Sequence, residues 1–147
     1  MRRSEPVETG SWSALDSGRG AGEPSDMVWI AVAGGGALGA VFRYAVFAAI
    51  GSARFPWATL IVNVVGAFGL AVVAGYLDAR GSVGGAGTRF LTVGFFGALT
   101  TYSTFNLELL SLARDGRWGA AAVYGGGTAV ACAVLGLVGL ACGRQLG

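Results

Sequence analysis

Apolar residues run along most of the chain in long stretches that few charges interrupt. Three such stretches cover residues 27–50, 58–77 and 119–142. Each has the roughly 20 residues that a helix needs to cross a hydrocarbon core about 30 Å thick. A fourth stretch, 90–112, is also long enough, but it carries a run of hydroxyl side chains. The pattern predicts an all-α integral membrane protein with four transmembrane helices.

Residues 1–26 differ from the rest of the chain. They are polar, rich in Gly, Ser and acidic residues, and hold no apolar stretch of the kind found in a signal peptide. This composition predicts a disordered tail, followed by a four-helix transmembrane domain over 27–147. Met27 lies at the start of the first span, so a chain that began there would lack the tail, and we expect the tail to be dispensable.

The composition agrees with a membrane protein and excludes several kinds of site. Of the 147 residues, 54% are hydrophobic and 12% are charged, and the chain has no histidine. Without histidine, and with Cys132 and Cys142 both in the last span, the chain lacks ligands for zinc, haem or an iron–sulfur cluster. We expect no enzymatic activity, because no nucleophile–base pair is apparent, and no nucleic-acid partner.

The arginines in the connections between spans indicate no preferred orientation. Arginines near span ends normally favour the cytoplasmic side. The first and third connections, which lie on one side of the membrane, hold three arginines: Arg54, Arg114 and Arg117. The second connection and the C-terminus, on the other side, also hold three: Arg80, Arg89 and Arg144. A chain with this balance could insert both ways round, which permits an antiparallel dimer.

Two polar residues stand out in the first two spans. Arg43 lies inside the first span, where insertion costs roughly 2.5–3.5 kcal/mol, so it either snorkels to the interface or attracts anions in a water-filled vestibule. Asn63 in the second span must face protein or water, because an amide facing lipid is costly. A hydrogen bond between helices is the default interpretation for Asn63. The small residues Gly35 and Gly39 share one helical face and indicate close packing against another helix.

Residues 97–108, which read GALTTYSTFNLE, place five hydroxyl side chains in a row. Glycines and hydrogen-bonding threonines compete with helical bonding, which predicts a break in the third span. Such a break is tolerated where the freed backbone groups face protein or a cavity. Its carbonyls would attract cations, and its N–H groups and hydroxyls would attract anions. Beyond the break, Tyr102, Phe105 and Glu108 share one helical face, and the edges of the two rings can help to solvate a small anion.

A stripe of polar or polarizable side chains follows one face of the last span. Tyr124, Thr128 and Cys132 recur every four residues. Threonine and cysteine are ordinary in membrane helices, so the stripe alone does not distinguish an ion pathway from helix packing.

Three segments together form a recognisable set of motifs. They read GGGALGAVFRY in the first span, TLIVNVVGAFG in the second and GFFGALTTYSTFNLE in the third. In this order and at these separations they resemble the Fluc/CrcB fluoride channels, and the resemblance extends over about residues 28–143. It implies a dual-topology, antiparallel homodimer in the inner (plasma) membrane, with the third helix broken at mid-membrane. It also implies passive export of cytoplasmic fluoride and a structural sodium ion that is not transported.

The resemblance assigns roles to individual residues. The backbone carbonyls of Gly97 and Thr100 would hold the sodium ion, and Arg43 would be the vestibule cation. With Ser103 and Thr104 as further donors, the fluoride pathway comprises Asn63, Tyr102, Ser103, Thr104, Phe105, Glu108, Tyr124, Thr128 and Cys132. Ala98, Tyr102 and Cys132 stand where the family commonly has Gly, Phe and Ser, which bears on rate and selectivity rather than on function.

A small multidrug-type proton-coupled transporter is the alternative interpretation, because such proteins also have four spans and often dual topology. A transporter of that class would need a membrane-embedded acid in its first span. Glu108, in the third span, is the only acid within any of the four.

Overall fold

The computed structural model describes residues 26–51, 53–81 and 84–147. The expected disordered tail therefore lies outside the described residues, except for Asp26, which begins the first helix. The described residues form helices and connections and contain no strand. In chain order the helices are α2 (Asp26–Ile50), α3 (Trp57–Ala79), α4 (Ala86–Arg89), η1 (Phe90–Phe96), α5 (Gly97–Leu99), α6 (Tyr102–Arg114) and α7 (Trp118–Leu146).

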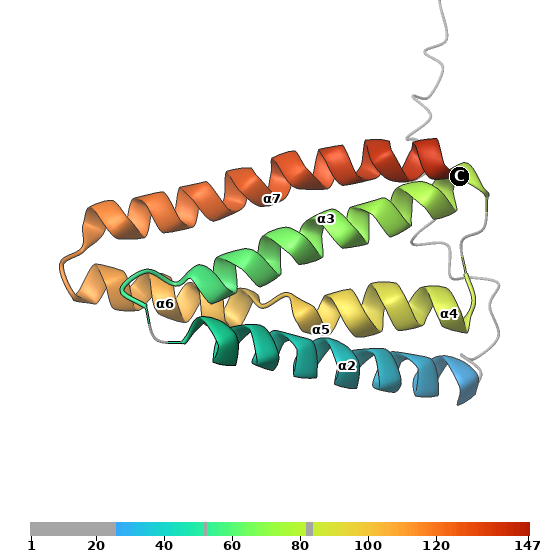
Figure 1. Cartoon of the computed structure of the whole chain (residues 1–147), viewed down its shortest axis with the longest axis horizontal. Helices are drawn as coiled ribbons and strands as arrows, with labels where there is room; N and C mark the ends of the chain where they lie inside the picture. The colour runs from blue at the N-terminus through green and yellow to red at the C-terminus, as the bar shows by residue number, and fades with distance from the viewer. Residues whose placement is uncertain (1–25, 52, 82–83) are drawn as a thin grey trace, which may run out of the picture.

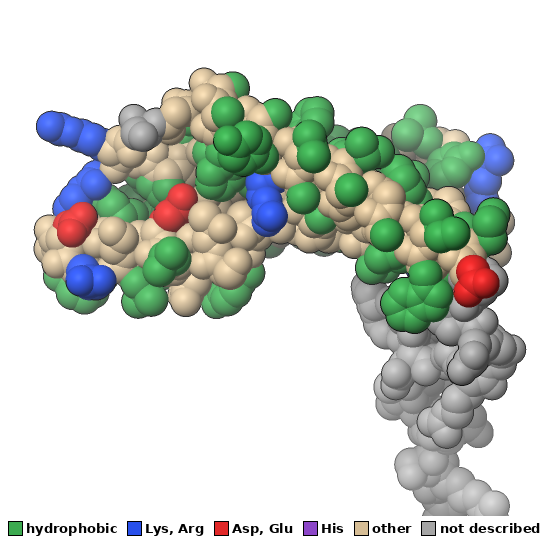
Figure 2. Space-filling view, turned by 90° about the horizontal axis from the view of Figure 1, so that it is seen from below, with side chains coloured by type: hydrophobic (Ala, Val, Ile, Leu, Met, Phe, Trp, Pro, Cys, Tyr) green, Lys and Arg blue, Asp and Glu red, His purple; other side chains and the backbone are tan. Residues whose placement is uncertain are grey.

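Three of these helices, α2, α3 and α7, are long and apolar enough to cross a membrane. Their outer faces expose large apolar side chains such as Phe42 on α2 and Val130 on α7. Figure 2 shows hydrophobic side chains spread over the face of the bundle seen from below. A water-soluble protein rarely exposes so many large apolar side chains. The chain is therefore a multi-pass membrane protein, as the three uninterrupted apolar stretches predicted.

The fourth predicted stretch, 90–112, is divided between short helices. α4, η1 and α5 follow one another without interruption, and two extended residues separate them from α6. Figure 1 shows this interruption as a thin connection between α5 and α6, with the two helical parts lying along the other helices of the bundle. The predicted break in the third span is thus present in the structure.

Glycines bring the helices into backbone contact. A Cβ atom on Gly35 or Gly39 would collide with the backbone of Phe90 or Phe95, so η1 packs directly on this face of α2. This confirms the close packing that the spacing of the two glycines predicted. On the other side of the bundle, a Cβ atom on Gly143 of α7 would collide with the carbonyl of Val72 on α3.

The segment η1 is a π-helix, which the sequence analysis did not predict. At its end, the N–H of Gly97 reaches the carbonyl of Thr92, five residues earlier. π-Helical turns are rare and often occur at functional sites. Here the π-helix is separated from the break only by the short helix α5, and it packs on the glycine face of α2.

Candidate functional site

The break in the third span consists of Thr100 and Thr101. Both residues are extended, with φ −78° and ψ 152° at Thr100 and φ −146° and ψ 110° at Thr101. The hydroxyl of Thr101 accepts the N–H of Thr104 at 3.3 Å and so caps the start of α6. The segment therefore stops one helix and starts another within two residues.

Asn63 of α3 holds the break in place. Its Oδ1 accepts the N–H of Thr101 at 2.7 Å, and its Nδ2 donates to the carbonyl of Thr101 at 3.2 Å. The side-chain amide thus supplies both a donor and an acceptor to one extended residue. This places Asn63 against protein rather than lipid, as its polarity required.

The break frees the backbone carbonyls of Gly97 and Thr100, which the family resemblance assigned to sodium, from their helical hydrogen bonds. In a continuous helix the carbonyl of Gly97 would accept the N–H of Thr101, but this N–H donates to Asn63 instead. The carbonyl of Thr100 would accept the N–H of Thr104, which donates to the hydroxyl of Thr101. Backbone carbonyls freed in this way are ligands that hard cations take in broken membrane helices. These two carbonyls are therefore of the kind that a sodium ion takes as ligands.

The threonine hydroxyls at the break bond mainly to their own segment. The hydroxyl of Thr100 donates to the carbonyl of Phe96 at 3.0 Å, and that of Thr101 donates to Thr104 Oγ1 at 2.9 Å. Ser103 Oγ lies 3.3 Å from Thr101 Oγ1. Much of the hydroxyl run thus stabilises the irregular backbone, in agreement with the expectation that these threonines compete with helical bonding.

A row of aromatic rings leads from the outside of the chain to its interior. Tyr102 is 77% exposed, and its ring centroid lies 5.8 Å from that of Phe105. The ring centroid of Phe105 lies 5.0 Å from that of Tyr124, which is fully buried. Tyr124 in turn contacts Phe55 edge to face, with the two ring centroids 5.6 Å apart. Tyr102 and Ser103 face outward in the single chain, whereas Phe105 and Tyr124 are brought together inside it.

Glu108 is held between two buried hydroxyl groups. The hydroxyl of Thr59 donates to Oε1 at 2.9 Å, and the hydroxyl of Tyr124 donates to Oε2 at 2.7 Å. Thr59 and Tyr124 are both 0% exposed. Each carboxylate oxygen thus has a donor of its own, so the carboxylate is fixed where α3, α6 and α7 meet.

The first two residues of the polar stripe on α7 face the interior of the bundle. Tyr124 and Thr128 are buried, and Cys132 is half-buried. The hydroxyl of Thr128 is buried and has no hydrogen-bond partner among the described residues. Buried hydroxyls are rarely left in this state, so a partner for this group has to be sought outside the described residues.

A cavity of about 350 Å³ opens where the α2–α3 and α6–α7 connections meet. Glu108 and Ser111 of α6 line it, together with Arg54 and Arg117 from the two connections. Arg117 Nη1 donates to the carbonyl of Arg54 at 2.8 Å and so ties the connections to each other. Glu108 and the two arginines thus line the same cavity.

Comparison with known proteins places the chain in a family. The family described as CrcB-like protein, Camphor Resistance (CrcB), matches residues 30–140. The chain belongs to the CrcB family. A fluoride-specific ion channel FluC of Opitutus terrae is 41% identical over 116 residues, which are 76% of this chain and 85% of that relative. A FluC of Magnetococcus marinus is 39% identical over 124 residues, which are 82% and 98% of the two chains. These relatives are named as channels, in agreement with the expectation that the chain is not an enzyme.

Arg43 of this CrcB chain lies on α2, one turn before Phe47, which lines the cavity. It is half-buried and is not among the described residues that line the cavity wall. Snorkelling and an attraction for anions both remain compatible with this position.

Two residues of the CrcB site were missed by the sequence analysis. Thr59 lies one turn before Asn63 on the same face of α3, so the spacing carried a signal that was overlooked. Phe55 precedes α3 in an irregular connection, and no local pattern indicates that its ring contacts Tyr124.

Proposed function

We propose that this CrcB chain forms a fluoride-selective channel that lets cytoplasmic fluoride leave passively, down its electrochemical gradient. The observation that carries the proposal is the buried hydroxyl of Thr128, which has no hydrogen-bond partner within the described part of the chain and lies one helical turn from Tyr124 on the same face of α7. Such a hydroxyl can donate its hydrogen bond to an anion. The FluC names of the relatives support fluoride as that anion.

The lining proposed for the pathway suits a strongly hydrated anion. Fluoride gives up its water only where other donors replace it, yet a channel must also release the ion. Asn63 keeps a second hydrogen on Nδ2, because its bond to Thr101 uses only one. Hydroxyls and the positive edges of Phe105 and Tyr124 provide weaker donors, which favours passage over tight binding.

A structural sodium ion at the break would supply a fixed positive charge close to the pathway. The carbonyls of Gly97 and Thr100 would hold it, because both have lost their helical donors to Asn63 and Thr101. In a medium of low dielectric, a nearby cation offsets much of the cost of bringing in an anion.

A second copy of the chain would complete the pathway. Gly97, Tyr102 and Ser103 are all exposed in the single chain, although they flank the break. Polar backbone and hydroxyl groups are costly against lipid, so this surface requires protein or water in the membrane. An antiparallel homodimer satisfies this requirement, and the balanced arginines permit both orientations. Light scattering of the detergent-solubilised protein would then give the mass of two chains.

The inner membrane fits the proposed direction of transport. Fluoride is an anion at cytoplasmic pH, and a negative-inside potential drives it outward with roughly 2.3 kcal/mol per charge for each 100 mV. No other energy source is needed.

The test is fluoride efflux from liposomes that contain the full chain, with a potassium ionophore to balance charge. We expect fluoride to leave, chloride to stay, and efflux to slow when N-methylglucamine replaces sodium. Fluoride retention by vesicles with folded protein would refute the channel, whereas unchanged efflux without sodium would refute only the sodium site. Proton-driven uptake of a quaternary cation would instead favour the multidrug-type transporter.

A further inference from the structure

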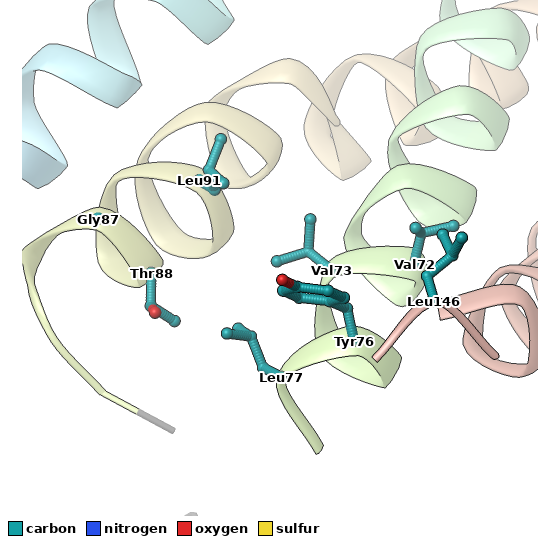
Figure 3. Close-up of a pocket in the computed structure, with 8 residues that line it drawn as sticks. All are labelled: Val72, Val73, Tyr76, Leu77, Gly87, Thr88, Leu91 and Leu146. Atoms are coloured by element: carbon teal, nitrogen blue, oxygen red, sulfur yellow. The ribbon is translucent and has the colours of Figure 1, made fainter. Parts of the chain in front are cut away.

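An apolar groove lies at the opposite end of the bundle from the Glu108 cavity. It has a volume of about 310 Å³ and is formed by the last turns of α3, the α4–η1 segment and the end of α7. Figure 3 shows Tyr76 and Val73 on the α3 side, facing Thr88 and Leu91 across the opening, with Leu146 beside α3. Its walls are almost entirely aliphatic or aromatic.

The groove lies at the level expected for the membrane interface. α3 ends at Ala79, α7 ends at Leu146 and α4 begins at Ala86, and these three helix ends lie together at one end of the bundle (Figure 1). Apolar helices of this length end near the lipid headgroups. Tyrosine beside arginine, as at Tyr76 and Arg80, is a combination typical of this zone.

Positive charge gathers at the rim of the groove. The guanidinium of Arg80 lies over the ring of Tyr76, 4.8 Å from its centroid. Arg89 lies in the last turn of α4, directly after Thr88, and is exposed. Arg144 is already paired with Asp78 at 3.0 Å, whereas Arg80 contacts Tyr76, which lines the groove.

We propose that this groove binds an anionic phospholipid. One acyl chain lies along the apolar wall between α3 and η1, and the phosphate of the headgroup pairs with Arg80. Basic positions beside grooves between membrane helices recognise anionic headgroups, and the aliphatic lining excludes a free phosphate ion as the occupant. The inference concerns a surface remote from the break, so it does not depend on fluoride conduction.

Native mass spectrometry of the full chain, with phosphatidylglycerol and phosphatidylcholine of identical acyl chains, tests this site. We expect retention of phosphatidylglycerol to exceed that of phosphatidylcholine about five- to tenfold. Arg80→Gln should abolish the preference, and Arg80→Lys should keep most of it. Arg114→Gln, which removes an exposed arginine at the other end of the bundle, should behave as wild type.

A groove-filling variant separates the lipid from other occupants. Val73→Trp should lower retention of phosphatidylglycerol without changing the number of chains in the complex. Equal retention of the two lipids by wild type, or an unchanged preference in Arg80→Gln, would overturn the proposal. A changed number of chains in Val73→Trp would also overturn it, because the groove would then be covered by a second copy. Glycerophosphate, which carries the headgroup phosphate without acyl chains, should not displace the lipid.

Discussion

Asn63 and Thr101 are joined by two hydrogen bonds, one in each direction between a side-chain amide and an extended backbone. The bonds measure 2.7 Å from the Thr101 N–H to Oδ1 and 3.2 Å from Nδ2 to the Thr101 carbonyl. Asn63 thus joins two helices and keeps the third span broken at the same time. Its structural and pathway interpretations are compatible, since Nδ2 has a second hydrogen.

Asn63→Ala removes both bonds and leaves backbone groups of Thr101 without partners. We expect a loss of about 1–3 kcal/mol in the free energy of unfolding, because buried polar groups lose their bonds. Fluoride efflux should fall to the level of empty liposomes. Thermal unfolding in detergent and liposome efflux measure the two effects. Gln145→Ala, which removes an exposed side-chain amide near the end of α7, is the control and should alter neither. Wild-type melting and efflux in Asn63→Ala would contradict the role assigned to this pair.

Thr128→Val separates a pathway residue from a packing residue. The hydroxyl of Thr128 has no partner among the described residues, so replacing it by a methyl group should leave stability unchanged or raise it by about 1 kcal/mol. Efflux should nevertheless slow by about tenfold if the hydroxyl replaces one fluoride–water hydrogen bond, equivalent to about 1.4 kcal/mol. Thr92→Val provides the comparison, because the Thr92 hydroxyl donates to the Thr88 carbonyl, and its efflux should match wild type. Undiminished efflux in Thr128→Val would remove this residue from the pathway.

Tyr124→Phe tests the bond between the Tyr124 hydroxyl and the Glu108 carboxylate. The ring keeps its contacts with Phe105 and Phe55, whereas Oε2 of Glu108 loses its donor. Hydrogen bonds to charged groups contribute about 1.5–3 kcal/mol, so we expect a lower unfolding temperature and slower efflux. Tyr44→Phe changes an exposed tyrosine of α2 and should have no effect. If both variants behave alike, the bond does not support the site.

Gly39→Ala tests the backbone contact between α2 and η1. A Cβ atom there would collide with the carbonyl of Phe95, and overpacking of this kind typically costs about 1–3 kcal/mol. We expect less folded protein after purification and a lower unfolding temperature. Gly36→Ala is the control, because nothing within the described chain lies within 4 Å of a Cβ atom at that position. Equal stability of the two variants would show that α2 and η1 are not in backbone contact.

The amino-acid sequence alone determined the features that depend on neighbouring residues. Runs of apolar residues predicted α2, α3 and α7, since the length and hydrophobicity of a membrane helix are local properties. Glycines and threonines predicted the break, because they weaken helical bonding wherever they cluster. A period of four placed Tyr124 and Thr128 on one face of α7.

Only the tertiary structure decided which distant groups meet. Hydrogen bonds between separate helices join Asn63 to Thr101 and Thr59 to Glu108. No local sequence pattern indicates how these helices are positioned along each other. The π-helix η1 likewise packs closely on the glycines of α2. The spacing of residues 90–96 does not indicate that these residues form a π-helix. Hydrogen bonds act over about 3 Å, so a pairing depends on the position of the whole helix rather than on the composition of its own segment.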